Sequence, residues 1–516
     1  MSIYVLPSFS SAFSLYTSTP DGVRMLQMCE ATRKTARGTK EYQLPSAMAT
    51  SSDFEERKLR KLSPIEKFFQ FSNDHTVNVT VYCLTIATLS PLQRSSVHSV
   101  LLHLYRKLPN LRVCIEEDRN GELWLCQMAQ ENILLKWLTS PEDFDAVYIG
   151  ETRKPHDARV GPLWRVTVMP AQDGPTPDAE FKHHYRVMFG LHHSITDGHS
   201  SMRLCGHFLS LLNSELEGNE VDDNEQFADY VGPEFHDKLV EEAKLTLSTN
   251  LYLQCKMRDD YAAIAAAESL LTKVFPPKEE VADPKTETLF IKFDEASTTK
   301  FVKKTKSEGV SVHSGFCSVL HSAFVELFQE AGASSEKFDI FSFHDVNERR
   351  YWNSESEKSY GPHLSLIRII LTVDKDCPSN VWESARQFHK VFLECLDNKQ
   401  TFFMEIIDAE VSPTVEKSTD FYSQKISSPS VYSTSNMGNV TKIFLAPDGA
   451  EYPQVKATEI RRSTSLHTYL NNNGFCFQTF RGELLVSFDY NTRYISTELA
   501  NRIVEKVRAH FLRHLS

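Results

Sequence analysis

Residues 192–198 read His-His-Ser-Ile-Thr-Asp-Gly, and this heptapeptide determines how the rest of the chain is interpreted. The apolar stretch 185–191 before it predicts a strand, and residues 199–212 after it have the apolar spacing of a helix. The heptapeptide therefore occupies a strand-to-helix turn, where a rigid scaffold holds chemically active side chains. Histidine titrates near neutral pH, so an imidazole here can accept and return a proton within one catalytic cycle.

The spacing His-His-x-x-x-Asp-Gly resembles the signature of the CoA-dependent acyltransferase superfamily. That superfamily includes alcohol acyltransferases, plant BAHD acyltransferases, chloramphenicol acetyltransferases and the condensation domains of peptide synthetases. The resemblance extends over most of residues 60–515, because weaker matches follow in the family's order: Leu62–Glu66, Leu108–Arg112, Gly161–Arg165, Val346–Arg349 and Ser435–Gly438. Each weaker match alone is unspecific, and their common order supports the resemblance.

The resemblance implies a two-lobed α/β fold of the chloramphenicol acetyltransferase type, each lobe a mixed sheet flanked by helices, with a tunnel between the lobes. A length of 516 residues independently favours two domains. We expect a poorly ordered extension over residues 1–47 and an N-terminal lobe carrying the heptapeptide over 48–274. A charged, proline-rich crossover linker is expected over 275–290, and a C-terminal lobe over 291–516.

Hydrophobic periodicity predicts further helices and strands along both lobes. Ser90-Pro91 has the pattern of a helix start, with an apolar helical stripe running to Leu108. Predicted strands cover residues 111–116, 123–128, 164–169, 288–293, 340–343, 366–373 and 484–490, and predicted helices cover 314–327 and 496–512.

His193 is the candidate general base. An alcohol must lose a proton as it attacks a thioester, and its own pKa lies far above neutral. The resemblance implies that the second histidine does this by direct transfer, without an acyl-enzyme. An isolated loop histidine would be interpreted as structural, but within this heptapeptide the catalytic interpretation is preferred. We expect the rate to fall in acid around the ordinary histidine pKa of about 6.5. His192 points to the opposite side of the strand and is expected to have a packing or hydrogen-bonding role.

Asp197 and Gly198 complete the heptapeptide. Asp197 could orient His193 as in a catalytic triad, but the resemblance implies that it points away and pairs with an arginine. Arg349 is the expected partner, with Arg350 as the near alternative. Gly198 permits a tight turn and a close backbone approach.

The oxyanion formed during attack requires hydrogen-bond donors. By resemblance to the Ser-Asn-x-Gly turn of alcohol acetyltransferases, Ser435 and Asn436 are candidate donors and Gly438 shapes the turn. Plant BAHD enzymes have Asp-Phe-Gly-Trp-Gly at this position, so the difference favours the alcohol acetyltransferase branch. No residue is assigned to the phosphates of CoA.

Charge, residue spacing and composition argue against several other classes of protein. The net charge of −12, from 56 basic and 68 acidic residues, argues against a nucleic-acid-binding protein. No zinc-binding spacing accompanies the nearby histidines, so no metal is expected; these histidines are His183, His184, His192, His193, His199 and His207. The scattered cysteines favour a reducing compartment. Without a membrane-length apolar run or secretory signal, we expect a cytoplasmic protein, and we expect it to be a monomer.

The sequence thus favours an acyl-CoA-dependent O-acyltransferase that uses acetyl-CoA or another acyl-CoA and a small, possibly terpenoid, alcohol. One alternative is a condensation-type enzyme that forms amides from a carrier-protein thioester. Another is a non-catalytic binding protein of the same fold, which the intact His, Asp and Gly of the heptapeptide argue against.

Overall fold

The computed structural model describes residues 51–515, apart from residues 141, 172–179, 231, 278–280, 282, 353–358, 412–429 and 468–472. The expected extension 1–47 lies outside the described residues. The chain divides into two compact units, residues 1–56 and 57–516. Within the first unit the described helix is α3, Ser51–Arg57, whose last residue already belongs to the second unit. All other described helices and strands belong to the second unit.

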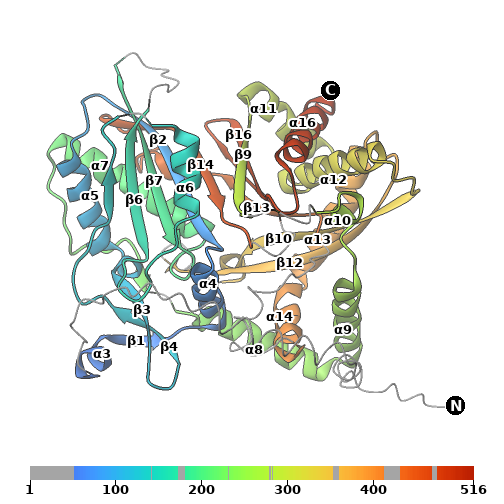
Figure 1. The fold of residues 1–516 in the computed structure, drawn as a ribbon, viewed down its shortest axis with the longest axis horizontal. Helices are drawn as coiled ribbons and strands as arrows, with labels where there is room; N and C mark the ends of the chain where they lie inside the picture. Colours follow the sequence, from blue (N-terminus) through green and yellow to red (C-terminus); the bar gives the residue numbers. More distant parts are fainter. Residues whose placement is uncertain are drawn as a thin grey trace. The chain divides into compact units, whose positions relative to one another are not determined.

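A five-stranded sheet carries the heptapeptide (Figure 1). Its order is β14-β2-β7-β6-β5, with bounds Val455–Thr464, Val79–Thr88, His183–His192, Trp164–Pro170 and Leu135–Trp137. Strands β6 and β7 are antiparallel neighbours, and β7 ends at His192. The two histidines of the heptapeptide therefore lie at one end of this sheet. Helices α5 (Arg94–Lys107) and α7 (Gly198–Glu217) pack together on one side of this sheet, and α6 (Phe144–Thr152) packs on the other.

A smaller sheet lies beside this lobe. Its order is β1-β4-β3, with bounds Lys58–Lys61, Leu123–Gln127 and Val113–Glu117. The 3-10 turn η1, Pro109–Arg112, precedes β3, so the strand expected from residue 111 begins two residues later. Helix α4, Pro64–Asp74, starts at a capping box formed by Ser63 and Glu66 and packs against β7.

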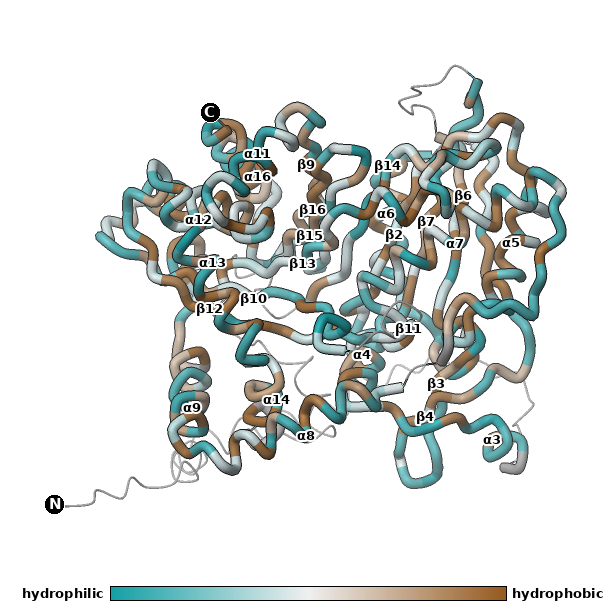
Figure 2. The backbone as a smooth tube through the Cα atoms, turned by 180° about the vertical axis from the view of Figure 1, so that it is seen from behind, coloured by the Kyte–Doolittle hydropathy of each residue, from teal (hydrophilic) through white to brown (hydrophobic). Residues whose placement is uncertain are grey.

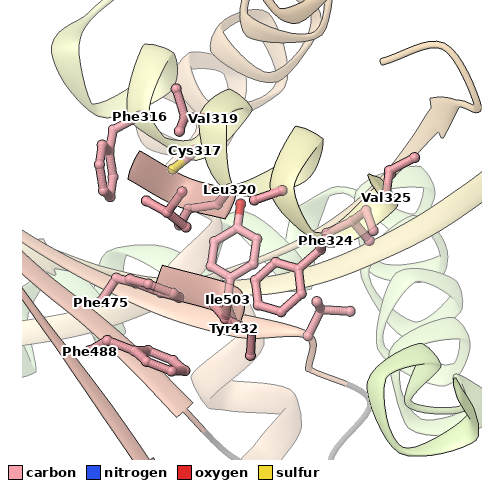
Figure 3. Packing of buried hydrophobic residues seen from close by; sticks show 14 of the residues in the cluster. Phe316, Cys317, Val319, Leu320, Phe324, Val325, Tyr432, Phe475, Phe488 and Ile503 are labelled. Atoms are coloured by element: carbon pink, nitrogen blue, oxygen red, sulfur yellow. The ribbon is translucent and has the colours of Figure 1, made fainter. Parts of the chain in front are cut away.

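The second large sheet has six strands in the order β12-β10-β13-β15-β16-β9. Their bounds are Leu364–Asp374, Lys337–Asn347, Tyr432–Asn439, Asn473–Phe480, Glu483–Asn491 and Thr286–Phe293. Helices α11 (Glu295–Ser307), α12 (Val312–Glu330), α13 (Val381–Asp397) and α16 (Thr497–Arg513) accompany it. The core between α12 and the sheet is rich in phenylalanine: Phe324 and Phe475 contact Tyr432, and Phe316 and Phe488 belong to the same cluster (Figure 3). The structure is therefore a two-lobed mixed α/β fold, as expected.

A helical group that the sequence patterns did not predict connects the lobes. It consists of α8 (Glu234–Thr249), α9 (Leu251–Ala266) and α14 (Gln400–Val411), which share a small core, and the short helix α10 (Leu270–Val274) follows. A two-stranded parallel pair joins β8 (Asp229–Tyr230), which follows α7, to β11 (Ser359–Tyr360), which lies between β10 and β12 in the sequence. Figure 2 shows hydrophobic residues along the strands of both large sheets, whereas α8 and α9 alternate between polar and apolar residues.

Three further expectations differ from the structure. Helix α5 begins at Arg94 rather than after Ser90, because the Ser90 carbonyl accepts a hydrogen bond from the Thr88 hydroxyl and the Leu92 N–H donates to the Tyr185 hydroxyl. These contacts hold the segment extended ahead of the helix. Strand β9 begins at Thr286, inside the expected linker. Strand β14 comes from the expected C-terminal lobe but pairs with β2 of the N-terminal sheet.

Candidate active site

The heptapeptide connects β7 to α7. Strand β7 ends at His192, and helix α7 begins at Gly198 with Asp197 as its N-cap. The Asp197 carboxylate accepts a hydrogen bond from the Ser200 N–H at 2.8 Å, which satisfies one of the free N–H groups at the helix start. The motif residues are thus held between a central strand and a helix of 20 residues.

His193 is held by an aromatic stack. Its ring lies 4.0 Å from the ring of Phe69 in α4, with an angle of 11° between the planes. The residue is partly exposed. Its Nδ1 is buried and has no hydrogen-bond partner among the described residues. Burial lowers the pKa of His193 below its ordinary value of 6.5, and the Asp197 charge and nearby backbone carbonyls oppose this effect in part. His193 is therefore neutral at pH 7, as a base must be. The decrease in rate in acid, expected near pH 6.5, should accordingly occur at lower pH.

His192 differs from its neighbour. It is buried, and its Nε2 lies 3.1 Å from Oε1 of Gln70. Its Nδ1 accepts the Ser194 N–H, so Nε2 carries the hydrogen and donates to Gln70. Burial, with the nearby charge of His193, lowers the pKa of His192 to about 3. Both ring nitrogens are engaged, which supports the expected hydrogen-bonding role.

Asp197 forms a buried ion pair with Arg349. Nη1 of Arg349 lies 2.6 Å from Oδ2 of Asp197, and the His363 N–H donates to the same oxygen. Burial alone would raise the pKa of Asp197, but Arg349 and the N–H donors lower it to about 2. The guanidinium of Arg350 lies over the Tyr351 ring instead, so Arg349 is the partner. With both carboxylate oxygens occupied by these donors, Asp197 does not orient His193 as in a catalytic triad.

Gly198 brings strand β13 against the motif. A β-carbon at Gly198 would lie 2.7 Å from the sulfur of Met437 and 3.7 Å from the Tyr82 hydroxyl. Met437 belongs to the Ser-Asn-x-Gly segment in β13. The structure therefore brings together two motifs that are far apart in the sequence.

Ser435, Asn436 and Gly438 lie on this approaching strand. The Asn436 Oδ1 accepts the Gly438 N–H at 2.8 Å, which orients the amide and directs its Nδ2 away from that bond. Gly438 has a φ of +68°, a left-handed conformation that favours glycine. The Ser435 Oγ accepts a hydrogen bond from Nη1 of Arg462 at 3.1 Å, and the Ser435 side chain also lies close enough to the Asp345 carboxyl to lower its pKa. Because Arg462 and Asp345 already surround the Ser435 hydroxyl, Asn436 is the stronger candidate donor to an oxyanion.

Two residues at this site were missed by the sequence patterns. Arg462 lies on β14 and Asp345 on β10, and both reach Ser435. The sequence patterns predicted no strand over either residue, so no local signal marked them. Which partner each would meet depends on strand pairing between distant segments.

One group of potential metal ligands occurs among the described residues, and it lies away from the histidines considered above. His313, Cys317 and His344 have ligand atoms within 4.8 Å of one another. However, the two ring nitrogens of His344 bond to the hydroxyls of Thr434 and Ser342. We therefore interpret this group as a buried hydrogen-bond network.

Two surface hollows are present elsewhere in the fold. One lies beside α10 and the start of α16, and the other lies among α8, α9 and α14. Neither includes a residue of the heptapeptide, and the tunnel implied by the resemblance remains a prediction. No helix in the described part of the chain is long and apolar enough to cross a membrane.

Comparison with known protein families identifies the family of this chain. The family model described as alcohol acetyltransferase matches residues 130–440, more than half of the chain. The protein belongs to the alcohol acetyltransferase family. It is therefore an acyltransferase. A search of curated proteins finds no match.

Solved structures support the fold of this alcohol acetyltransferase family member. TRI3 trichothecene 15-O-acetyltransferase from Fusarium sporotrichioides aligns with a TM-score of 0.61 at 11% identity, covering 91% of this chain and 99% of that one. The first condensation domain of the CDA synthetase aligns with a TM-score of 0.62 at 12% identity, covering 89% and 97%. Polyketide synthase associated protein 5 from Mycobacterium tuberculosis aligns with a TM-score of 0.59 at 11% identity, covering 89% and 99%. The expected two-lobed acyltransferase fold is confirmed.

Proposed function

We propose that this acyltransferase transfers an acetyl group from acetyl-CoA to the hydroxyl of a small alcohol, with His193 as the general base. The observation that carries the proposal is the state of His193. Its ring is neutral, partly exposed and fixed against Phe69, whereas the ring nitrogens of neighbouring His192 are already bonded. The family match supports the alcohol as acceptor.

In the proposed reaction, His193 accepts the hydroxyl proton as the alcohol oxygen attacks the thioester carbonyl. A tetrahedral intermediate forms, and its oxyanion receives hydrogen bonds from donors on β13, with Asn436 as the main candidate. When the intermediate collapses, the carbon–sulfur bond breaks and protonated His193 returns the proton to the leaving thiolate. The products are the ester and free CoA, and no acyl-enzyme is formed.

The Asp197–Arg349 pair has a positioning role in this proposal. It joins the start of α7 to the segment after β10, and therefore holds the turn that carries His193. Removing one partner of such a pair leaves an uncompensated buried charge, which costs about 3–5 kcal/mol.

The test combines acetyl-CoA with a pool of alcohols and amines and measures thiol release and product mass. We expect ester products, and we expect His193→Ala to lower kcat by about 10²–10⁴ while the fold is retained. His98→Ala is the matched control, because His98 lies exposed on α5. Wild-type turnover by His193→Ala would disprove the assignment of the base.

A condensation-type reaction is the second candidate, because the fold aligns equally well with condensation domains. Such an enzyme would require a carrier-protein thioester and would form amides. Saturation by free acetyl-CoA with ester formation would exclude it. Amide formation only from a carrier-bound acyl group would favour it.

A further inference from the structure

The proposed mechanism does not use Asp345, a carboxyl group beside the active-site strand. Strand β10 pairs in parallel with β13, with His344 opposite Thr434, so the next pair places Asp345 beside Ser435. The Ser435 side chain lies close enough to the Asp345 carboxyl to lower its pKa. β10 is an interior strand with β12 on its other side, yet the Asp345 side chain is exposed to solvent.

Asp345 faces the side of the sheet that carries the active-site ion pair. Side chains two residues apart on a strand share a face, so Asp345 and Asn347 point the same way. The Asn347 Oδ1 accepts a hydrogen bond from Nη1 of Arg349 at 3.2 Å, and the same Nη1 bonds to Asp197. The accessible carboxyl group therefore lies on the face that meets the heptapeptide.

The environment of Asp345 combines enclosure with a nearby positive charge. Burial by the surrounding protein raises its pKa to about 6, although the Ser435 side chain and the charge of Arg462 oppose this rise. The hydrogen bonds of Arg462 in the described part of the chain reach only uncharged acceptors: the Ser435 Oγ and carbonyl, the Gln478 Oε1 and the Phe477 carbonyl. Asp345 thus supplies negative charge near this buried cation and remains mainly ionised at pH 7.

We propose that Asp345 binds the acceptor: its carboxylate accepts a hydrogen bond from a second, non-reacting hydroxyl, so the preferred acceptor is a diol or polyol. This inference rests on the proposed function. A neutral hydroxyl fits better than an ammonium group, because Arg462 already places a positive charge near Asp345. A hydrogen bond to a charged group corresponds to roughly a ten- to hundredfold change in affinity.

The first experiment compares matched acceptors. Thiol release from acetyl-CoA is measured with 1-octanol and with the 1,2-, 1,4- and 1,8-octanediols. We expect the wild-type protein to favour at least one diol over 1-octanol by about tenfold or more in kcat/KM, through a lower KM. In Asp345→Leu this ratio should fall to about one, and in the isosteric Asp345→Asn it should fall part of the way. Asp339→Leu, on the same face of β10 six residues earlier, should keep the wild-type ratio. Equal use of octanol and the diols by the wild type, or an unchanged ratio in Asp345→Leu, overturns the inference.

The second experiment measures binding without an acyl donor. The same octanediols are titrated calorimetrically into the wild-type protein, Asp345→Leu and Asp339→Leu. We expect binding that weakens about tenfold or more in Asp345→Leu only. Asp345-dependent binding without thiol release from any alcohol would support this subsite while rejecting the proposed function. Absent binding, or binding that is the same in Asp345→Leu, would reject the subsite whatever the turnover.

Discussion

Two adjacent histidines of the heptapeptide have opposite surroundings. The strand directs His192 into the interior, where Gln70 and Ser194 engage its ring. His193 lies on the other side, stacked on Phe69 and partly exposed. Burial lowers the pKa of both rings, but only His193 combines neutrality with exposure. Alternation along one strand therefore gives neighbouring residues of the same type different roles.

The pKa of His193 predicts the pH dependence of the reaction. The base must be unprotonated, so a lowered pKa preserves the active form to a pH below 6.5. We expect kcat/KM to be constant from pH 7 to 8 and to fall only below pH 6.5, approaching a tenfold decrease per pH unit. Initial rates measured with a single alcohol, with circular dichroism at each pH as the control for folding, provide the check. A midpoint above pH 6.5 in a folded protein would contradict this assignment.

At the scale of helices and strands, α7 lies very close to the segment that follows β13. A β-carbon at Gly206 would lie only 2.5 Å from the Ile443 carbonyl oxygen in the 3-10 turn η4, Thr441–Phe444. At the first residue of the same helix, a β-carbon at Gly198 would lie 2.7 Å from the sulfur of Met437. Both glycines therefore let the helix that begins at the active site approach the strand with the candidate oxyanion donors.

We predict that Gly206→Ala destabilises the protein. Alanine is favoured over glycine within a helix by about 1 kcal/mol. The clash with a backbone oxygen, which cannot rotate away as a side chain can, costs about 1–3 kcal/mol and should exceed that gain. Gly150→Ala in α6 is the matched control: a β-carbon there meets no atom within 4 Å, so we expect a gain of about 0.5–1 kcal/mol. Urea unfolding of both variants measures the two free energies, and equal effects would rule out the close packing of α7.

For the molecule as a whole, β14 makes the two sheets interdependent. It pairs with β2 in the five-stranded sheet, and it also packs against β15 and β16 of the six-stranded sheet. Arg462 on β14 is buried and donates to Ser435 on β13 and Gln478 on β15. A single buried guanidinium therefore connects a strand of one sheet to two strands of the other.

We predict that Arg462→Met lowers the free energy of unfolding by at least about 2 kcal/mol, because several buried acceptors lose their donor at about 1–3 kcal/mol each. Arg386→Met in α13 is the control. Arg386 is exposed and its ion pairs are with Glu308 and Glu383, so its loss should cost about 1 kcal/mol or less. Chemical unfolding of both variants tests the difference. Similar stabilities would mean that Arg462 does not connect the sheets energetically.

Local pattern alone predicted the strand, turn and helix around His193, because alternation and helical period are properties of neighbouring residues. The order of the family motifs also predicted that Arg349 would meet Asp197. The tertiary structure alone decided that β14 joins the first sheet, that Arg462 and Asp345 both reach Ser435, and that α8, α9 and α14 form a separate small core. These features depend on which distant strands and helices pack together, and the local sequence pattern does not determine that packing.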